Sequence, residues 1–360
     1  MWTMQELLDA VCEQGASDLV LSVGTPPQLR ILGELQPLND YRLKPEDVET
    51  LCYSILSESQ KALLERRKSL DFSMGFTGLS RFRFNIYHQR GSLALAARII
   101  PFDIPGFQEL GVLEDIFTWF SMRMQGLVLV SGAAGSGKST SLAAMINYIN
   151  EHRAAHIICL EDPIEYLHHH RKSTVDQREI FKDAPSFAAA LRDVFRQSPD
   201  VIMVGEMRDM ETMQFAMTLA ETGHLVLATL HTQDTVQAIS RIVDSFPASH
   251  QQQVYTQLSM VLTGVVSQCL LMSTDRARRV LAYEVMIATT AVRNLIREHQ
   301  LHQLYSAIQT GSSVGMSTMN DTLCRLVASG VVAQQAAMDR SPRPKELERM
   351  LESARSKSHD

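Results

Sequence analysis

Cysteine is scarce and scattered in this chain of 360 residues. No two cysteines form a Cys-x-x-Cys pair, and they lie far apart at Cys12, Cys52, Cys159, Cys269 and Cys324. An odd number of isolated cysteines supports neither a disulfide framework nor a zinc site. Hydrophobic residues make up 45% of the chain, so a sizeable core is possible without such cross-links.

Long hydrophobic runs and an excess of positive charge are absent as well. No apolar run approaches the roughly 20 residues that a membrane-spanning helix needs. The first residues, MWTMQELLDAVCEQ, do not join a basic region to an apolar one, so we expect no signal peptide. The net charge of −6 argues against a dedicated nucleic-acid-binding protein, although a local basic patch is compatible with it. These absences predict a soluble, cytoplasmic protein without a transmembrane segment.

The pattern of the chain changes along its length and predicts an α/β protein. Residues 1–100 combine helical spacing in MQELLDAVCEQ with β-rich runs such as RFRFNIYH and SLALAARII, as in a small α+β domain. Prolines and a glycine in PFDIPG place a linker at 101–110. Alternating strand, turn and helix patterns predict a parallel α/β sheet at 111–272. Beyond about residue 235 the pattern is mostly helical, so we expect a helical region at 273–360 with a frayed, charged tail.

A glycine-rich loop follows the buried-type run GLVLV (126–130). SGAAGSGKST contains the pattern G-x-x-x-x-G-K-[ST], with a strand before it and the helical SLAAMINYIN after it. Backbone N–H groups of such a loop surround phosphate oxygens, and the following helix presents its positive end to the same anion. Lys138 is expected to reach the β/γ-phosphates, and the Ser139 hydroxyl to bind Mg²⁺. The predicted ligands are ATP and Mg²⁺, and the candidate binding residues are Gly132, Gly135, Ser136, Gly137, Lys138, Ser139 and Thr140.

Three further strand-like runs end in chemically active side chains. HIICL is followed by Glu161, VIMV by Gly205 and Glu206, and HLVLATL by His231. Ligands of open parallel sheets bind beyond the carboxyl ends of the strands, so these side chains should converge on the phosphate loop.

Charge suggests roles for these groups. Hydrolysis needs a carboxylate to orient and deprotonate water, and Mg²⁺ needs an acidic partner near the loop. We assign to Glu161 the role of orienting and deprotonating the water, and to Glu206 the role of acidic partner of Mg²⁺. The reverse assignment is also open, and Asp162 and Glu165 remain alternatives for the base. His231 is placed to sense the γ-phosphate.

Four segments of the chain resemble the four boxes of secretion-type ATPases: SGAAGSGKST, LEDPIEY, SPDVIMVGEMRD and ETGHLVLATLHT. With QGASDLVLS and AVRNLIRE, the chain is similar to the PilT-like retraction motors of type IV pili over nearly its whole length. The resemblance implies a PAS-like N-terminal domain, a RecA-like P-loop ATPase domain, a homohexamer, ATP hydrolysis, and docking to an inner-membrane pilus platform protein. Such a protein would be cytoplasmic and peripheral at the inner membrane face.

The resemblance also carries residue roles. It matches the catalytic glutamate to Glu161, the Walker B glutamate to Glu206, and two family histidines to His224 and His231. Three arginines match family positions expected to reach nucleotide from the N-terminal domain: Arg81, Arg83 and Arg98. An arginine that stabilises transferred phosphate across an interface is physically reasonable. Val20 stands where the family usually has histidine and Ser198 where it often has an acid, which puts local contacts in doubt.

The AVRNLIRE segment poses a separate question. On a helix, Val292, Leu295 and Ile296 share one face, while Arg293 and Arg297 repel each other by a few tenths of a kcal/mol. A plain surface helix is one interpretation. We instead expect the apolar side chains to pack on the ATPase and Arg293, Asn294 and Arg297 to face a neighbouring element or the platform protein.

Several alternatives stay open from sequence. An accessory pilus motor, a type II secretion or pilus assembly ATPase, and a catalytically weak regulatory subunit share much of this pattern. A RecA-like nucleic-acid translocase is disfavoured, because the chain has no basic stripe.

Overall fold

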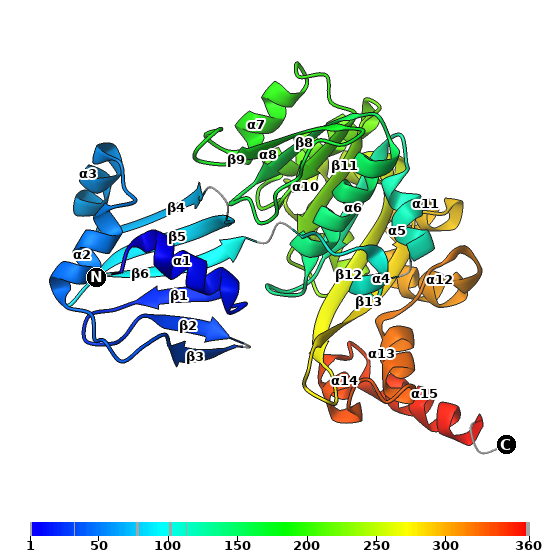
Figure 1. Cartoon of the computed structure of the whole chain (residues 1–360). Helices are drawn as coiled ribbons and strands as arrows, with labels where there is room; N and C mark the ends of the chain where they lie inside the picture. Colours follow the sequence, from blue (N-terminus) through cyan, green and yellow to red (C-terminus); the bar gives the residue numbers. More distant parts are fainter. Residues whose placement is uncertain (1, 32, 77–78, 101–102, 113, 358–360) are drawn as a thin grey trace. The chain divides into compact units, whose positions relative to one another are not determined.

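The computed structural model describes residues 2–31, 33–76, 79–100, 103–112 and 114–357. They form two compact units, drawn in Figure 1. The first unit is Met1–Asp103 with Glu165–Leu167, and the second is Ile104–Ile164 with His168–Asp360. Of the predicted linker at 101–110, residues 101 and 102 lie outside the described residues, while Phe107–Leu110 forms helix α4.

The first unit is built on an antiparallel sheet with the order β3-β2-β1-β6-β5-β4. Its strands are β1 (Asp18–Leu21), β2 (Gln28–Ile31), β3 (Glu34–Pro37), β4 (Ser69–Gly75), β5 (Arg81–Gln89) and β6 (Ser92–Ile100). Its helices are α1 (Met4–Glu13), α2 (Pro45–Tyr53) and α3 (Glu58–Arg67). Phe82, Phe84 and Ile86 of β5 are fully buried, whereas Arg83 between them is exposed. The alternation of RFRFNI therefore places one face of the strand in the core and the arginines on the other.

The second unit contains a seven-stranded sheet with the order β13-β12-β7-β11-β10-β8-β9. All neighbours are parallel except β12 and β13. The strands are β7 (Gly126–Ser131), β8 (His156–Glu161), β9 (Thr174–Glu179), β10 (Val201–Val204), β11 (Leu225–Leu230), β12 (Leu262–Met272) and β13 (Arg279–Ile287). The α/β prediction for this part of the chain is confirmed.

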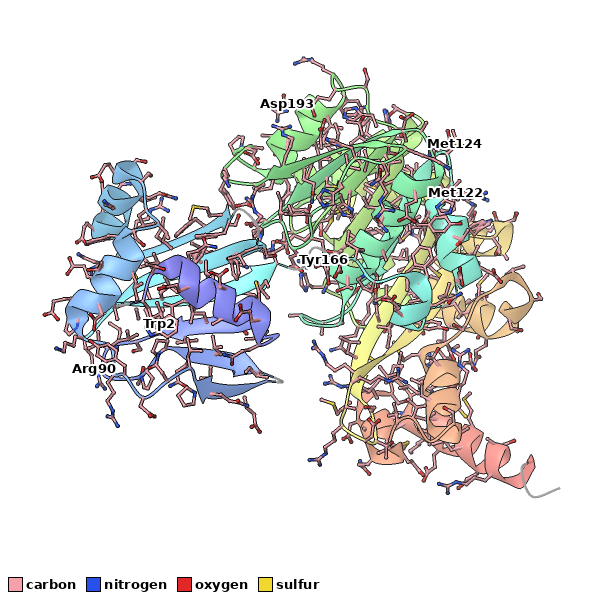
Figure 2. The ribbon with its side chains drawn as sticks, in the orientation of Figure 1. Trp2, Arg90, Met122, Met124, Tyr166 and Asp193 are labelled. Carbon is pink, nitrogen blue, oxygen red and sulfur yellow. The ribbon has the colours of Figure 1, made fainter. Side chains whose placement is uncertain are left out.

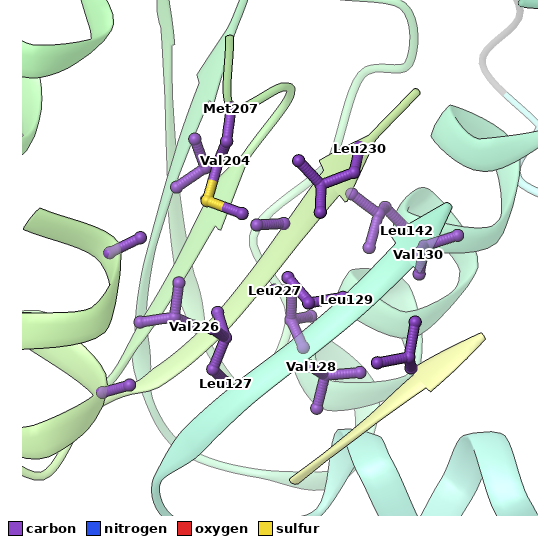
Figure 3. Packing of buried hydrophobic residues seen from close by; sticks show 14 of the residues in the cluster. Leu127, Val128, Leu129, Val130, Leu142, Val204, Met207, Val226, Leu227 and Leu230 are labelled. Atoms are coloured by element: carbon purple, nitrogen blue, oxygen red, sulfur yellow. The ribbon is translucent and has the colours of Figure 1, made fainter. Parts of the chain in front are cut away.

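The central strands of this sheet are buried on both faces. Every residue of β7 and β11 is buried, which explains why their sequences are nearly continuous apolar runs. Figure 3 shows Leu127, Leu129 and Leu227 among side chains packed in this core, together with Leu142 of the following helix. This packing fixes the strand ends, and the strand ends carry the candidate site.

Helices cover the sheet of the second unit. They are α4 (Phe107–Leu110), α5 (Glu114–Ser121), α6 (Lys138–His152), α7 (Phe187–Val194), α8 (Met210–Glu221), α9 (Thr235–Asp244), α10 (Ala248–Val261), α11 (Thr290–Arg297), α12 (Leu304–Thr310), α13 (Met319–Ala328), α14 (Gln334–Arg340) and α15 (Pro344–Lys357). Short 3₁₀ turns lie at Leu301–Gln303 and Ser312–Val314. Figure 1 shows α6 on the near face of the sheet, and α8 also contacts β7 and β11.

The C-terminal part is mostly helical, as predicted, but it differs from the prediction in two places. Residues 262–287 are not helical, because β12 and β13 pair from Gly264↔Ile287 to Met272↔Arg279 and extend the sheet past residue 272. Their β-branched and apolar residues, VLTGVVSQCLL, fit a buried strand as well as a helix, and tertiary pairing decides. The tail is not frayed over 344–357 either, because α15 buries Leu347 and Leu351 against α13 and α14. Residues 358–360 lie outside the described residues.

Across the described part of the chain, no helix is long and apolar enough to cross a membrane.

Candidate functional site

A tight loop joins β7 to α6 and has the backbone geometry of a phosphate-binding loop. Gly132 and Gly137 adopt φ angles of +147° and +91°, which side chains rarely tolerate. A Cβ atom on Gly132 would overlap the Gln268 carbonyl oxygen and the Ser136 hydroxyl. Glycine is therefore required at this turn, and α6 can begin immediately afterwards at Lys138.

Polar side chains of the loop point inward. Lys138 is buried, and its Nζ donates to the carbonyl oxygens of Gly132 at 2.8 Å and Ala133 at 2.9 Å. The hydroxyl oxygen of Ser136 is buried without a hydrogen-bond partner among the described residues. An unsatisfied buried hydroxyl costs about 1–3 kcal/mol, and a phosphate oxygen would satisfy it. Ser139 and Thr140 are half-buried in the first turn of α6. The loop therefore fits a polyphosphate.

The other candidate residues lie at the same edge of the sheet. One row of the sheet runs through Leu129, Ala228, Val204 and Leu160. Glu161, Glu206 and His231 lie one, two and three residues beyond this row, and the phosphate loop begins three residues beyond it. Neighbouring strands are about 4.8 Å apart, so these groups gather along an edge roughly 15 Å wide.

Glu206 and His231 are in direct contact. Glu206 Oε2 lies 3.4 Å from His231 Nε2 and 2.7 Å from Arg208 Nε. The glutamate side chain is only 12% exposed, whereas the histidine is 50% exposed and the arginine 71%. The carboxylate is thus held inside the edge of the sheet, with two nitrogen groups reaching it from the solvent side. Sequence reasoning missed Arg208, although its place two residues after Glu206 in GEMRD was a signal.

Glu161 is buried at the end of β8, and one of its oxygens accepts a hydrogen bond of 2.9 Å from Gln177 Nε2. Gln177 lies on β9, directly opposite Cys159 in the parallel pair of strands. The two alternatives for the base differ from Glu161 in their environment, because Asp162 and Glu165 are both exposed. Glu165 also belongs to the first unit. Sequence reasoning also missed Gln177, since DQRE carries no motif.

His224 does not join the other histidine. It precedes β11, where its carbonyl oxygen accepts from the Gly126 amide at 3.0 Å, at the amino end of the parallel strands. Its ring Nδ1 lies 3.0 Å from the Leu219 carbonyl oxygen. His231 follows the other end of the same strand, so the sheet separates the two.

The three candidate arginines lie on β5 and β6 of the first unit. Arg83 forms two hydrogen bonds with Asp71, the shorter 2.7 Å, and Arg98 Nε donates to Asp18 at 2.7 Å. Arg81 donates to the Ser73 hydroxyl at 2.9 Å. Arg83 and Arg98 are register partners on the two strands. They therefore form one basic cluster on the open face of that sheet.

AVRNLIRE forms helix α11, with Val292 and Ile296 fully buried and Leu295 packed against the core. The packing prediction for these three residues is confirmed. Arg293 does not point away from the protein. Its guanidinium donates to the carbonyl oxygens of Ser259, Met260 and Ala288, the first two in the last turn of α10.

Arg297 behaves differently from Arg293. It is exposed and contacts Asn294, also exposed, and Glu298. The expected repulsion is thus relieved, because only one of the two arginines lies against the body of the protein. A cavity of about 700 Å³ beside Arg293 is lined by Met122 and Met124, labelled in Figure 2, among other residues.

Comparisons with known proteins show which family this chain is similar to. The profile of the family described as "Type II/IV secretion system protein" matches residues 102–339. The "Type IV pilus retractation ATPase PilT" of Pseudomonas aeruginosa is 44% identical over 339 residues, which cover 94% of this chain and 98% of that protein. A "Twitching motility protein" of Neisseria gonorrhoeae is 44% identical over 315 residues, covering 88% and 84%. The crystal structure of the pilus retraction motor PilT with bound ADP matches with a TM-score of 0.91 and 48% identity, covering 97% of this chain and all of that one.

Proposed function

Because the chain belongs to the type II/IV secretion system protein family, as an ATP hydrolase homologous to pilus retraction ATPases over nearly its whole length, we propose that it powers type IV pilus retraction and twitching motility. One observation carries this proposal. The phosphate loop shares the carboxyl edge of one sheet with a buried glutamate, Glu161, and with the Glu206–His231 pair.

Each residue has a distinct task in the proposed hydrolysis. The loop amides and Lys138 bind the β/γ-phosphates, and Lys138 exchanges its two loop carbonyls for phosphate oxygens. Glu161 orients the attacking water and accepts its proton, while Gln177 fixes one carboxylate oxygen. The water oxygen bonds to the γ-phosphorus as the bond to the bridging oxygen breaks, releasing ADP and phosphate. His231, held by Glu206, donates toward the γ-phosphate and registers its loss.

The residues at this edge also fit Mg²⁺. The Ser139 hydroxyl and the Glu206 carboxylate are hard oxygen ligands of the kind Mg²⁺ prefers, and they would hold the ion. When bound with ATP, Mg²⁺ would neutralise phosphate charge.

The family and the basic cluster support a proposal for the assembly. We propose a homohexamer in which a PAS-like N-terminal domain supplies Arg81, Arg83 and Arg98 to a RecA-like ATPase domain of a neighbouring subunit. The arginines would then exchange Asp71 and Asp18 for phosphate. The ring would work in the cytoplasm at the inner membrane face, against a pilus platform protein and without nucleic acid.

Two substitutions test the chemistry. Lys138→Ala should weaken nucleotide binding and turnover together, because the lysine contacts phosphate. Glu161→Gln should keep binding of ATP and lose turnover, because it acts on water only. Binding is measured with a fluorescent ATP analogue, and turnover as phosphate release. A Glu161→Gln protein that hydrolyses ATP at nearly the wild-type rate would move the role to Asp162 or Glu165.

Retraction is tested in cells. A strain that lacks its retraction motor should recover twitching when it expresses this chain, but not when it expresses the Lys138→Ala variant at the same level. If the purified protein hydrolyses ATP but the wild-type chain does not restore twitching, the protein is an ATPase that drives a process other than retraction.

A further inference from the structure

Glu284 is a buried carboxylate that the proposed hydrolysis does not use. It lies on β13, is 2% exposed, and binds donors from two different helices. Its Oε1 accepts from the Thr235 amide at 3.0 Å and the Thr235 hydroxyl at 2.7 Å, and its Oε2 accepts from the Met319 amide at 3.4 Å. Thr235 and Met319 are the first residues of α9 and α13. The carboxylate therefore bridges two helix N-termini, where negative charge is favoured.

The α9 side of this bridge leads directly to the nucleotide site. Four residues, 231–234, join β11 to α9, and we call them the His231 loop. His231, the first of them, contacts Glu206, and Thr235 follows the last. Gln233 in the same loop accepts a hydrogen bond of 2.9 Å through its carbonyl oxygen from the buried Ser267 hydroxyl. The loop is thus held at two points by strands β12 and β13.

These two points belong to one row of the sheet. Ser267 is the register partner of both Glu284 and Ser131, and Ser131 is the partner of Leu230. Ser131 immediately precedes the phosphate loop, and Leu230 immediately precedes His231. A single transverse row therefore connects the base of both nucleotide-site loops to Glu284.

The α13 side leads away from the site into the C-terminal helices. Met319 and Leu323 of α13 are buried in a separate hydrophobic cluster with Leu347 and Leu351 of α15. This cluster includes Leu271 of β12 and Ala282 of β13, and Cys269 and Val280 of the same strands also pack against it. A shift of α13 would move these helices together, because interiors are closely packed.

We propose that Glu284 is a positioning residue that couples the His231 loop to α13 and the C-terminal helices. This inference rests on the proposed function of the site. When the γ-phosphate is lost and His231 moves, Thr235 shifts at the end of the same short loop. Glu284 transmits the shift to the α13 N-terminus, and in the other direction it holds His231 in place for hydrolysis. Burial raises the pKa of Glu284, and the hydrogen bonds from Thr235 offset part of that increase.

Glu284→Gln tests the bridge with little change of shape. Its single amide oxygen can satisfy Thr235 or Met319, and its NH₂ group then faces a donor on the other side, so one half of the bridge is lost. Thr322→Val is the matched control. The Thr322 hydroxyl donates to the Tyr283 carbonyl oxygen at 2.8 Å, so it also ties α13 to β13 without reaching the His231 loop.

Hydrogen exchange of the purified full-length chain, with and without ADP, reads the coupling. In the wild type, ADP should slow exchange in α6 and change exchange in 319–328. Glu284→Gln should keep the α6 response and lose the response of 319–328, while Thr322→Val keeps both. The kcat of Glu284→Gln for ATP should fall about 10- to 100-fold with KM nearly unchanged, as expected for a misplaced catalytic group.

Either of two results overturns the proposal: an α13 response that survives in Glu284→Gln, or an equal loss in Thr322→Val, which would mean that packing of α13 alone matters. If Glu284→Gln does not fold, Thr235→Val replaces it, because it removes only the hydroxyl donor and should weaken the same response. Failure of the proposed function is recognised separately, as a wild-type chain without ATP turnover, and the ADP experiment still tests the coupling.

Discussion

The two arginines of AVRNLIRE should differ sharply in their effect on stability. Arg293 donates hydrogen bonds to three backbone carbonyls, those of Ser259, Met260 and Ala288. Among the described residues, the polar contacts of Arg297 are with the side chains of Asn294 in its own helix and Glu298 at the end of that helix. The first two carbonyls belong to the last turn of α10, which has no intrahelical donor for them. Arg293→Ala therefore removes the C-terminal cap that α11 supplies to α10. Arg297→Ala removes only a contact at the surface.

The size of the effect follows from the environment of the bonds. A hydrogen bond from a charged donor contributes about 1.5–3 kcal/mol when buried. Arg293 is half-buried beside the 700 Å³ cavity, so water reaches the carbonyls after truncation and restores part of the loss. We expect a net cost of about 2 kcal/mol, close to the upper limit for a cation at a helix C-terminus. Exposed pairs such as Arg297–Glu298 contribute about 0–1 kcal/mol.

Thermal unfolding followed by calorimetry checks this difference. At about 2–4 °C per kcal/mol for a unit of this size, Arg293→Ala should lower Tm by about 4–8 °C. Arg297→Ala should lower it by less than about 4 °C. Arg293→Lys should fall between them, since an ammonium cannot reproduce the fork of the guanidinium. Equal Tm values for the two alanine variants would refute the capping role. Twitching assays should then use Asn294→Ala with Arg297→Ala, because that variant leaves the cap in place.

Three further predictions concern other residues. His231→Ala should lower kcat for ATP at least about tenfold, whereas His224→Ala at the far end of β11 should stay within about threefold, and phosphate-release assays decide. Mixed rings of Arg83→Ala and Lys138→Ala subunits should recover some ATPase activity, while no recovery in verified mixed rings counts against sites completed between subunits. Burial lowers the pKa of His168 to about 4 from 6.5. The contribution of His168 to the free energy of unfolding is therefore fully present above pH 6.5 and is lost as the pH falls toward 4. At pH 5 the loss is about 2 kcal/mol. His168→Gln should lack this part of the Tm decrease, and a parallel decrease in both proteins would contradict it.

Much of the site could be predicted because the end of a buried strand can be recognised in the sequence alone. The runs GLVLV, VIMV and HLVLATL are apolar because their strands are buried on both faces, and a polar residue marks where burial stops. Once the strands are parallel, their ends must share an edge. The contact of Glu206 with His231 follows from that rule, although the partners Arg208 and Gln177 do not.

The errors have the same physical origin. An apolar run such as VLTGVVSQCLL has no period that separates a buried strand from a buried helix, and only pairing with β7 and β13 decides. His224 carries a family match but stands before its strand, so its position at the amino edge was readable from HLVLATL. The bonds of Arg293 to α10 could not be predicted, because those two acceptors lie more than 30 residues away along the chain and are backbone atoms without a sequence signature.

The position of α11 constrains how this motor could work. It follows β13, which runs antiparallel to β12, so α11 lies at the amino edge of the parallel strands, with Arg293 bonded to residues just before β12. The phosphate loop lies at the other edge, across the six residues of β7, or about 20 Å. Chemistry at one edge cannot act on α11 by contact. A buried sheet deforms little, so motion should reach α11 along the flanking helices, of which α10 contacts it directly, and α11 should respond to nucleotide only as strongly as those helices do.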